Sequence, residues 1–194
     1  MKKIHYPIDK NKWHPSLIPG PVVLISTYDS KKRPNIAPKS WLQMVSFKPP
    51  ILMFSGTKGN TTERNILESR CFGVNFVDSS MASEVYGCIK WSGRERIEKT
   101  GFTIIEASKI NAPLVDDCKA HLECRLHATC EVGSGFVIFG EIVVALIWEK
   151  ILSVSAKGGS AYGREPEKRY QFLDQIVFLE EGMFSKINKV SEVK

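Results

Sequence analysis

The sequence predicts a mainly β protein: an antiparallel β-barrel with a few peripheral helices. Residues 121–132 (HLECRLHATCEV) alternate between apolar and polar side chains, which is the pattern of a strand with one buried face. Most other apolar segments are short and are separated by short turns. Prolines within these segments confine them to sheet edges, ends or turns, which suits a barrel better than a flat parallel sheet.

The first half of the chain predicts four extended segments. Residues 30–35 (SKKRPN) and the KPP sequence at 48–50 contain the turn residues that separate the first three. The predicted strands are 19–29 (PGPVVLISTYD), 36–47 (IAPKSWLQMVSF), 51–56 (ILMFSG) and 71–77 (CFGVNFV).

Helices are few. We expect one at about 61–70, one at about 80–89, where Met81, Val85 and Ile89 are spaced by four, and a short one at 94–99. Apolar residues in the C-terminal segment 167–184 fit neither the helical nor the strand period, so its structure is left open.

The second half predicts a long β-hairpin. Residues 121–132 and 136–148 (FVIFGEIVVALIW) form its strands, and Gly-Ser-Gly at 133–135 forms the turn. Gly140 within the second strand predicts either a bulge or a close approach of another group.

The composition limits the classes of function. A chain of 194 residues with 43% hydrophobic residues fits a single globular domain. The net charge of +6 comes from scattered basic residues, which favours anionic ligands without marking a nucleic-acid site. No apolar run has the roughly 20 residues of a membrane helix, and the N-terminus does not resemble a signal peptide, so we expect a cytoplasmic protein without membrane contact.

The five cysteines do not indicate a metal site. They include no CxxC pair, and we expect them to be reduced and mostly buried. Although His121, Cys124 and His127 lie close in sequence, residues three apart on a strand point to opposite faces, which excludes a shared zinc ion. Both histidines are expected on the polar face of the strand.

A polar loop after the third strand, SGTKGNTTERN at 55–65, has the features of a phosphate site. Asn60 can cap the following helix, and Glu63 is placed to complete a capping box. Free amides, the helix dipole and the side chains of Thr57, Lys58, Thr61 and Thr62 would then converge. The alternative is a capped helix after a flexible turn.

A second polar element interrupts the extended segment 36–47. The Pro38–Lys39–Ser40 sequence breaks the strand and exposes backbone groups, which could bind the edge of a flat heterocycle beside the ring of Trp41. The alternative is that Trp41 belongs to the core.

Taken together, residues 19–77 resemble the flavin reductase-like family, the FMN-binding split barrels that include flavoredoxins. The resemblance includes the NIA segment, the PP break, the polar loop, the NI helix and the GVN strand, in this order. It continues more loosely through 94–103 and the long hairpin to about residue 163. It implies a homodimeric, Greek-key split β-barrel at about 15–163 with FMN near the subunit interface, followed by a C-terminal extension at 164–194.

The resemblance also implies roles for individual residues. Those implied for the phosphate and ribityl chain are Thr57, Lys58, Asn60, Thr61 and Thr62, with Ser55 and Gly56 beside the ribityl. Those implied for the isoalloxazine are Lys39, Ser40 and Trp41. Arg96 takes a place where the family often has lysine, and Tyr162 is expected near the flavin; surface solvation of Arg96 and an ordinary turn role for Tyr162 are the alternatives.

One departure concerns the electron donor. Gly135 stands where many members have a histidine beside the nicotinamide, so direct oxidation of NADH or NADPH is open. The expected function is an FMN-dependent oxidoreductase that either reduces flavin with NADH or NADPH or carries electrons for a redox partner protein. The alternative is a non-catalytic FMN-binding module. A nucleic-acid-binding barrel ranks last, because the polar face of 121–132 is mixed in charge and has no aromatic residue.

Overall fold

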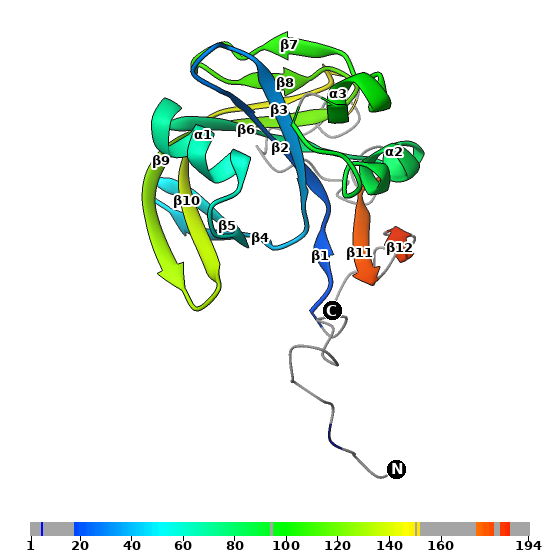
Figure 1. The fold of residues 1–194 in the computed structure, drawn as a ribbon, viewed down its shortest axis with the longest axis horizontal. Helices are drawn as coiled ribbons and strands as arrows, with labels where there is room; N and C mark the ends of the chain where they lie inside the picture. Colours follow the sequence, from blue (N-terminus) through cyan, green and yellow to red (C-terminus); the bar gives the residue numbers. More distant parts are fainter. Residues whose placement is uncertain are drawn as a thin grey trace, which may run out of the picture.

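The computed structural model describes residues 5, 18–93, 95–149, 151, 174–180 and 183–186. Its largest sheet contains seven antiparallel strands in the order β3-β2-β6-β9-β10-β5-β4 (Figure 1). The strands are β2 Val23–Tyr28, β3 Pro34–Lys39, β4 Leu42–Phe47, β5 Pro50–Thr57, β6 Cys71–Phe76, β9 Ala120–Val132 and β10 Gly135–Ile147. The predicted antiparallel barrel is confirmed.

The barrel is split between β3 and β4. These strands are neighbours in sequence, yet they form the two opposite edges of the sheet. Ser40 and Trp41 make the connection, so the prediction of one continuous segment over 36–47 is corrected to two strands. Pro34 and Pro38 both lie in the edge strand β3, where a missing N–H does not interrupt a sheet.

Strand β2 is buried on both faces because it separates two cores. Val23 and Ile25 face the barrel interior, together with Phe54, Phe72 and Ile138. The alternate residues of β2 face a second core. This second core contains Val22, Leu24, Ile36, Val77, Met81, Val85, Cys88, Val115, Cys118 and Ile176.

The helices lie close to their predicted positions. Helix α1 covers Thr61–Ser69, and its Ile66 reaches the barrel core. The predicted helix at 80–89 is a short 3-10 turn, η2 Ser79–Met81, which continues into α2 Ala82–Gly87. The third helix, α3, covers Glu95–Thr100.

Gly140 satisfies both alternatives that the sequence offered. The β9–β10 register shifts between Phe139 and Gly140, which marks a bulge. A Cβ built on Gly140 would lie 2.3 Å from Cζ of Phe72, so the aromatic ring occupies the place of a side chain.

The predicted faces of the first hairpin strand are wrong at both ends. His121 and Glu123 are buried, not solvated. Glu123 accepts hydrogen bonds from the backbone N–H of Ser108 and Lys109, and Nδ1 of His121 lies 3.0 Å from Oδ1 of Asn75. The segment leading from β7 Ile104–Glu106 to β8 Pro113–Val115 therefore covers the polar face there.

At the far end of β9 the apolar face is solvated instead. Ala128, Cys130 and Val132 are exposed where the β9–β10 hairpin forms its tip. The other four cysteines are buried, so the expectation of mostly buried thiols is confirmed.

The C-terminal segment that had no clear period contains two strands. Strands β11 Ile176–Glu180 and β12 Met183–Lys186 form a hairpin, and β11 also pairs with β1 Gly20–Pro21. This three-stranded sheet is separate from the barrel sheet (Figure 1).

Candidate functional site

The N-terminus of α1 is shaped by its cap. Oδ1 of Asn60 accepts a hydrogen bond from the backbone N–H of Glu63 at 2.9 Å, which confirms the predicted cap. The Glu63 carboxylate accepts from the N–H of Gly59 at 2.6 Å, one residue before the position that a capping box requires. These contacts fix the loop that joins β5 to α1.

A cavity of about 270 Å³ lies beside this helix end. Strand β3, the β5–α1 loop, the first turn of α1, and the segment that leads into α3 form its walls. Its lining residues are Ala37, Lys39, Thr57, Gly59, Asn60, Thr61, Thr62, Arg64, Ser92, Gly93 and Arg96.

Arg96 is fixed in this wall by carbonyl groups. Its Nε donates to the carbonyls of Cys88 and Trp91, each at 2.9 Å, and its Nη1 donates to the carbonyl of Ile36 at 3.0 Å. The guanidinium is therefore held in one orientation, and the surface-solvation alternative for Arg96 does not hold. Burial lowers the pKa of Arg96 from its ordinary value.

Lys39 brings a second cation to the same cavity. Burial, and then the charge of Arg96, lower the pKa of Lys39. A Cβ built on Gly56 would lie 3.0 Å from Nζ of Lys39, so the glycine leaves room for the ammonium. Within the described residues, no carboxylate forms an ion pair with Lys39 or Arg96. Two adjacent cations at the positive end of a helix are suited to hold an anion, so this cavity is the candidate anion site.

Hydroxyl groups complete the cavity. Oγ1 of Thr62 accepts a hydrogen bond from Nδ2 of the buried Asn35 at 3.2 Å, which leaves the Thr62 proton to be donated elsewhere. Oγ1 of Thr61 accepts from Nη2 of Arg64 at 3.3 Å. Arg64 also lines the cavity but is not among the predicted site residues. Its position one helical turn after Asn60 was the signal in the sequence that places it at the same end of α1.

Lys58 does not line this cavity. Its Nζ forms an ion pair with Oε2 of Glu131 at 2.5 Å on the β9–β10 hairpin, and both side chains are more than half exposed, 53% and 61%. A phosphate role for Lys58 stays a prediction.

Ser40, Trp41 and Ser55 line a larger cavity of about 590 Å³. It lies beside the connection between β3 and β4, with Met53 of β5 and Val137 of β10 among its walls. Trp41 is 52% exposed, so the alternative that it belongs to the core is wrong. Ser40 therefore adjoins a cavity large enough for a planar ring system, while Lys39 faces the anion site. The predicted residue Tyr162 lies outside the described residues.

Two kinds of feature are absent from the described residues. These residues contain no cluster of three or more His, Cys, Asp or Glu side chains suited to a metal ion. None of their helices has the length and apolarity needed to cross a membrane.

Known proteins share this sequence pattern and fold. The sequence model of the flavin reductase like domain matches residues 16–153. A protein of uncharacterised function from Aquifex aeolicus is 31% identical over 147 residues, covering 70% of this chain and 73% of its own.

Solved structures share the fold at lower identity. Nitrilotriacetate monooxygenase component B from Bacillus cereus superposes with a TM-score of 0.81 at 21% identity, covering 99% of this chain and 100% of its own. Flavoredoxin from Desulfovibrio vulgaris superposes with a TM-score of 0.80 at 20% identity, covering 100% of this chain and 97% of its own. Because the domain model matches residues 16–153, which is most of the chain, the chain belongs to the flavin reductase-like family of flavoprotein oxidoreductases.

Proposed function

We propose that the protein binds FMN and uses it to transfer electrons from NADH or NADPH, either to flavin or to a redox partner protein. Lys39, Arg96, Thr57, Thr61 and Thr62 would hold the phosphate. Ser40, Trp41 and Ser55, at the larger cavity, would contact the flavin ring and ribityl chain.

The observation that carries this proposal is the pair of cations without an acidic partner in the described chain. Burial lowers the pKa of both Lys39 and Arg96, and the charge of Arg96 lowers the pKa of Lys39 further, so it is costly to hold the two charges side by side without an anion. A phosphate between them would offset this cost and accept hydrogen bonds from the threonine hydroxyls and helix amides. The arrangement fits a phosphate monoester, and hence FMN over riboflavin.

Bound flavin supplies the hydride and electron chemistry of such proteins. The residues of this chain bind and orient the flavin. Arg96, held by three carbonyl groups, provides a fixed donor, and the Asn35–Thr62 hydrogen bond fixes one hydroxyl. Trp41 lies at the mouth of the larger cavity and would exclude water from one side of a bound ring.

One observation bears on the electron donor and another on the electron acceptor. Gly135 pairs with Thr57 in the β5–β10 ladder at this end of the barrel and offers no side chain to a nicotinamide. A protein partner is supported by the Bacillus cereus relative, which is named as a component of a monooxygenase. The alternative, a non-catalytic FMN-binding module, predicts flavin binding without oxidation of either nicotinamide.

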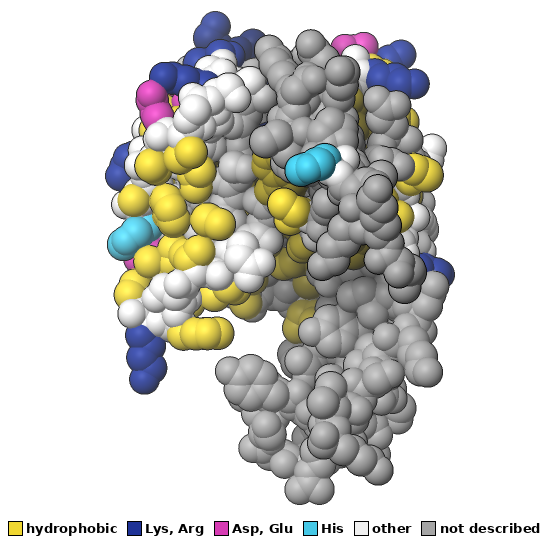
Figure 2. All heavy atoms as spheres, turned by 90° about the horizontal axis from the view of Figure 1, so that it is seen from below, with side chains coloured by type: hydrophobic (Ala, Val, Ile, Leu, Met, Phe, Trp, Pro, Cys, Tyr) yellow, Lys and Arg dark blue, Asp and Glu magenta, His cyan; other side chains and the backbone are white. Residues whose placement is uncertain are grey.

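We further propose a homodimer. Edge strand β4 exposes Met44, Val45 and Phe47, the last at 83%, and the hairpin tip exposes Val132. Figure 2 shows hydrophobic side chains gathered on this side of the molecule. An exposed apolar edge strand has unpaired backbone N–H and C=O groups that can bond to a second copy, which would also cover the apolar side chains. Light scattering that finds a monomer with FMN bound would refute the dimer.

The decisive test is titration of the purified protein with FMN, FAD and riboflavin, followed by steady-state oxidation of NADH and NADPH. We expect FMN to bind at least about tenfold more tightly than riboflavin, because charge-assisted hydrogen bonds to the phosphate contribute about 1.5–3 kcal/mol. Equal affinity for riboflavin would refute the phosphate site. Tight FMN binding without nicotinamide oxidation would favour electron transfer with a protein partner or the binding module.

A further inference from the structure

A third cavity lies between α2 and the C-terminal β11–β12 hairpin. It has a volume of about 160 Å³, and its walls are mostly apolar. Helix α2 and the residues after it contribute Val85, Tyr86 and Ile89, and the hairpin contributes Phe178 and Phe184. Phe178 and Phe184 lie outside residues 16–153, the part of the chain that the family model matches.

The aromatic walls are packed against each other. Phe184 makes edge-on contacts with Tyr86, at 6.1 Å between ring centroids, and with Phe178, at 5.7 Å. These separations fall in the range of favourable aromatic pairs. The rings are thereby positioned before any ligand enters.

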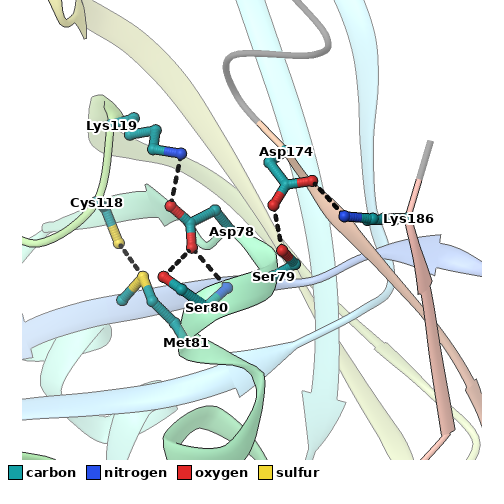
Figure 3. A network of polar contacts seen from close by, with 8 residues as sticks. All are labelled: Asp78, Ser79, Ser80, Met81, Cys118, Lys119, Asp174 and Lys186. Atoms are coloured by element: carbon teal, nitrogen blue, oxygen red, sulfur yellow. Dashed lines mark hydrogen bonds and ion pairs between the residues drawn. The ribbon is translucent and has the colours of Figure 1, made fainter. Parts of the chain in front are cut away.

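A polar network fixes both sides of this cavity to the same turn (Figure 3). Ser79 in η2 donates its hydroxyl to Asp174, and its N–H bonds to the carbonyl of Asp174 at 3.0 Å. Asp174 also lies 3.6 Å from Nζ of Lys186 at the end of β12.

The same turn is tied to the barrel. The Asp78 carboxylate accepts from the Ser80 backbone at 2.9 Å and pairs with Lys119 at 2.8 Å. Since α2 follows η2 directly in the chain, one cluster of contacts sets the positions of the helix and the hairpin. The opening between them is therefore a built feature of the fold.

The volume and lining indicate the kind of occupant. An enclosed apolar cavity of about 150 Å³ can hold benzene. This cavity has a similar volume, but it is open to solvent on the side of the exposed Ile89. Lys39 lines this cavity as well, but its Nζ lies toward Gly56 and the anion site, so its aliphatic stem is what remains for this wall. Among the residues that the structure describes, no other charged side chain lines the cavity, and Ser40 provides a hydroxyl at its edge.

We propose that this cavity is a binding subsite for an uncharged molecule with a single aromatic ring. The ring lies between α2 and the β11–β12 hairpin, and a hydroxyl or carbonyl substituent forms a hydrogen bond with Ser40. The inference does not depend on FMN binding, although Lys39 forms part of both cavities.

The test is titration of the full-length protein with 4-fluorophenol, followed by fluorine NMR, with benzoate and cyclohexanol as competitors. We expect saturable binding of the phenol. We expect at least about tenfold weaker competition by benzoate, because the apolar cavity offers a carboxylate no partner charge. Cyclohexanol should also compete weakly, because it lacks the contacts of an aromatic ring.

Two variants and a control locate the binding. Ile89→Trp places a large side chain at the rim, where Ile89 is 60% exposed and folding is not at risk. Phe184→Ala removes the central ring of the wall. Both should weaken phenol binding at least about tenfold, since truncating or blocking a well-packed aromatic anchor is costly. Ile105→Trp on β7, where Ile105 is 37% exposed, is the matched control and should leave binding unchanged.

The outcomes separate this inference from the proposed function. Absence of saturable binding, equal binding by all three variants, or equal competition by benzoate would overturn it. Displacement of the phenol by FMN would assign the cavity to the flavin itself and would also overturn a separate subsite. FMN affinity is measured independently by absorbance, so loss of FMN binding with phenol binding retained would refute only the proposed function.

Discussion

Replacement of Lys39 by methionine tests the anion site most directly. Methionine keeps the length and apolar character of the lysine stem, so the wall shared with the neighbouring cavity stays filled. The change removes one charge from a cavity where Arg96 is the neighbouring cation. A hydrogen bond to a charged group contributes about 1.5–3 kcal/mol, so FMN should bind about tenfold to about a hundredfold more weakly.

The stability of the flavin-free protein should change in the opposite direction. Burial and the charge of Arg96 both disfavour the Lys39 ammonium. Removing the ammonium therefore removes the cost of burying it and its repulsion by Arg96. We therefore expect the free energy of unfolding to stay the same or rise. A residue with a merely structural role would lower stability and FMN affinity together.

The assay is titration with FMN and with riboflavin, beside urea unfolding of the flavin-free forms. Lys58→Ala is the matched control, because the Lys58 ammonium pairs with Glu131 outside the cavity. It should change FMN affinity little, since exposed ion pairs contribute about 0–1 kcal/mol. Retained FMN affinity in Lys39→Met would refute the reasoning, and so would an equal loss in Lys58→Ala.

Three further predictions concern pH and packing. FMN affinity should fall as pH rises, because the Lys39 ammonium loses its proton. Since the pKa of Lys39 is lowered, this fall should begin below the ordinary lysine pKa of about 10.4. FMN titrations of Lys39→Met across the same pH range should not show the fall. Despite burial, hydrogen bonds from Lys119 and Ser80 keep the pKa of Asp78 below its ordinary value, so its stabilisation is present above about pH 4 and is lost on acidification. Unfolding of Asp78→Asn should accordingly depend less steeply on acidic pH, and parallel slopes would contradict this. Gly140→Ala should cost about 1–3 kcal/mol, because the new Cβ meets the Phe72 ring; an unchanged urea midpoint would contradict the clash.

The local features of this fold could be predicted from the sequence. The alternation of apolar and polar residues over 121–132, with the Gly-Ser-Gly turn after it, predicted the long β9–β10 hairpin, and Gly140 predicted its bulge. Asn60 was identifiable as a cap because its side chain and the helix it starts are adjacent in the chain. The irregularity at Pro38–Lys39–Ser40 was visible as well, because proline ends regular pairing.

Features that depend on distant segments could not be predicted in the same way. Alternation assigned His121 and Glu123 to a polar face but could not show that the segment between β7 and β8 covers it. The orientation of Lys58 depends on Glu131, which only the β9–β10 hairpin brings within reach. The convergence of Lys39 and Arg96 likewise requires the tertiary packing of α3 against β3. Family resemblance placed both residues near the flavin, whereas their mutual proximity came from the structure.

The gap between β3 and β4 also has a consequence for motion. Backbone hydrogen bonds hold every other pair of adjacent strands in the described barrel, but none joins these two edges. Lys39 lies at the end of β3, and Thr57 lies at the end of β5, which pairs with β4. A phosphate held by both would connect the two sides of the opening. FMN should therefore slow amide hydrogen exchange in β3 and β4 together, far beyond the residues it touches, and inorganic phosphate should reproduce part of that protection.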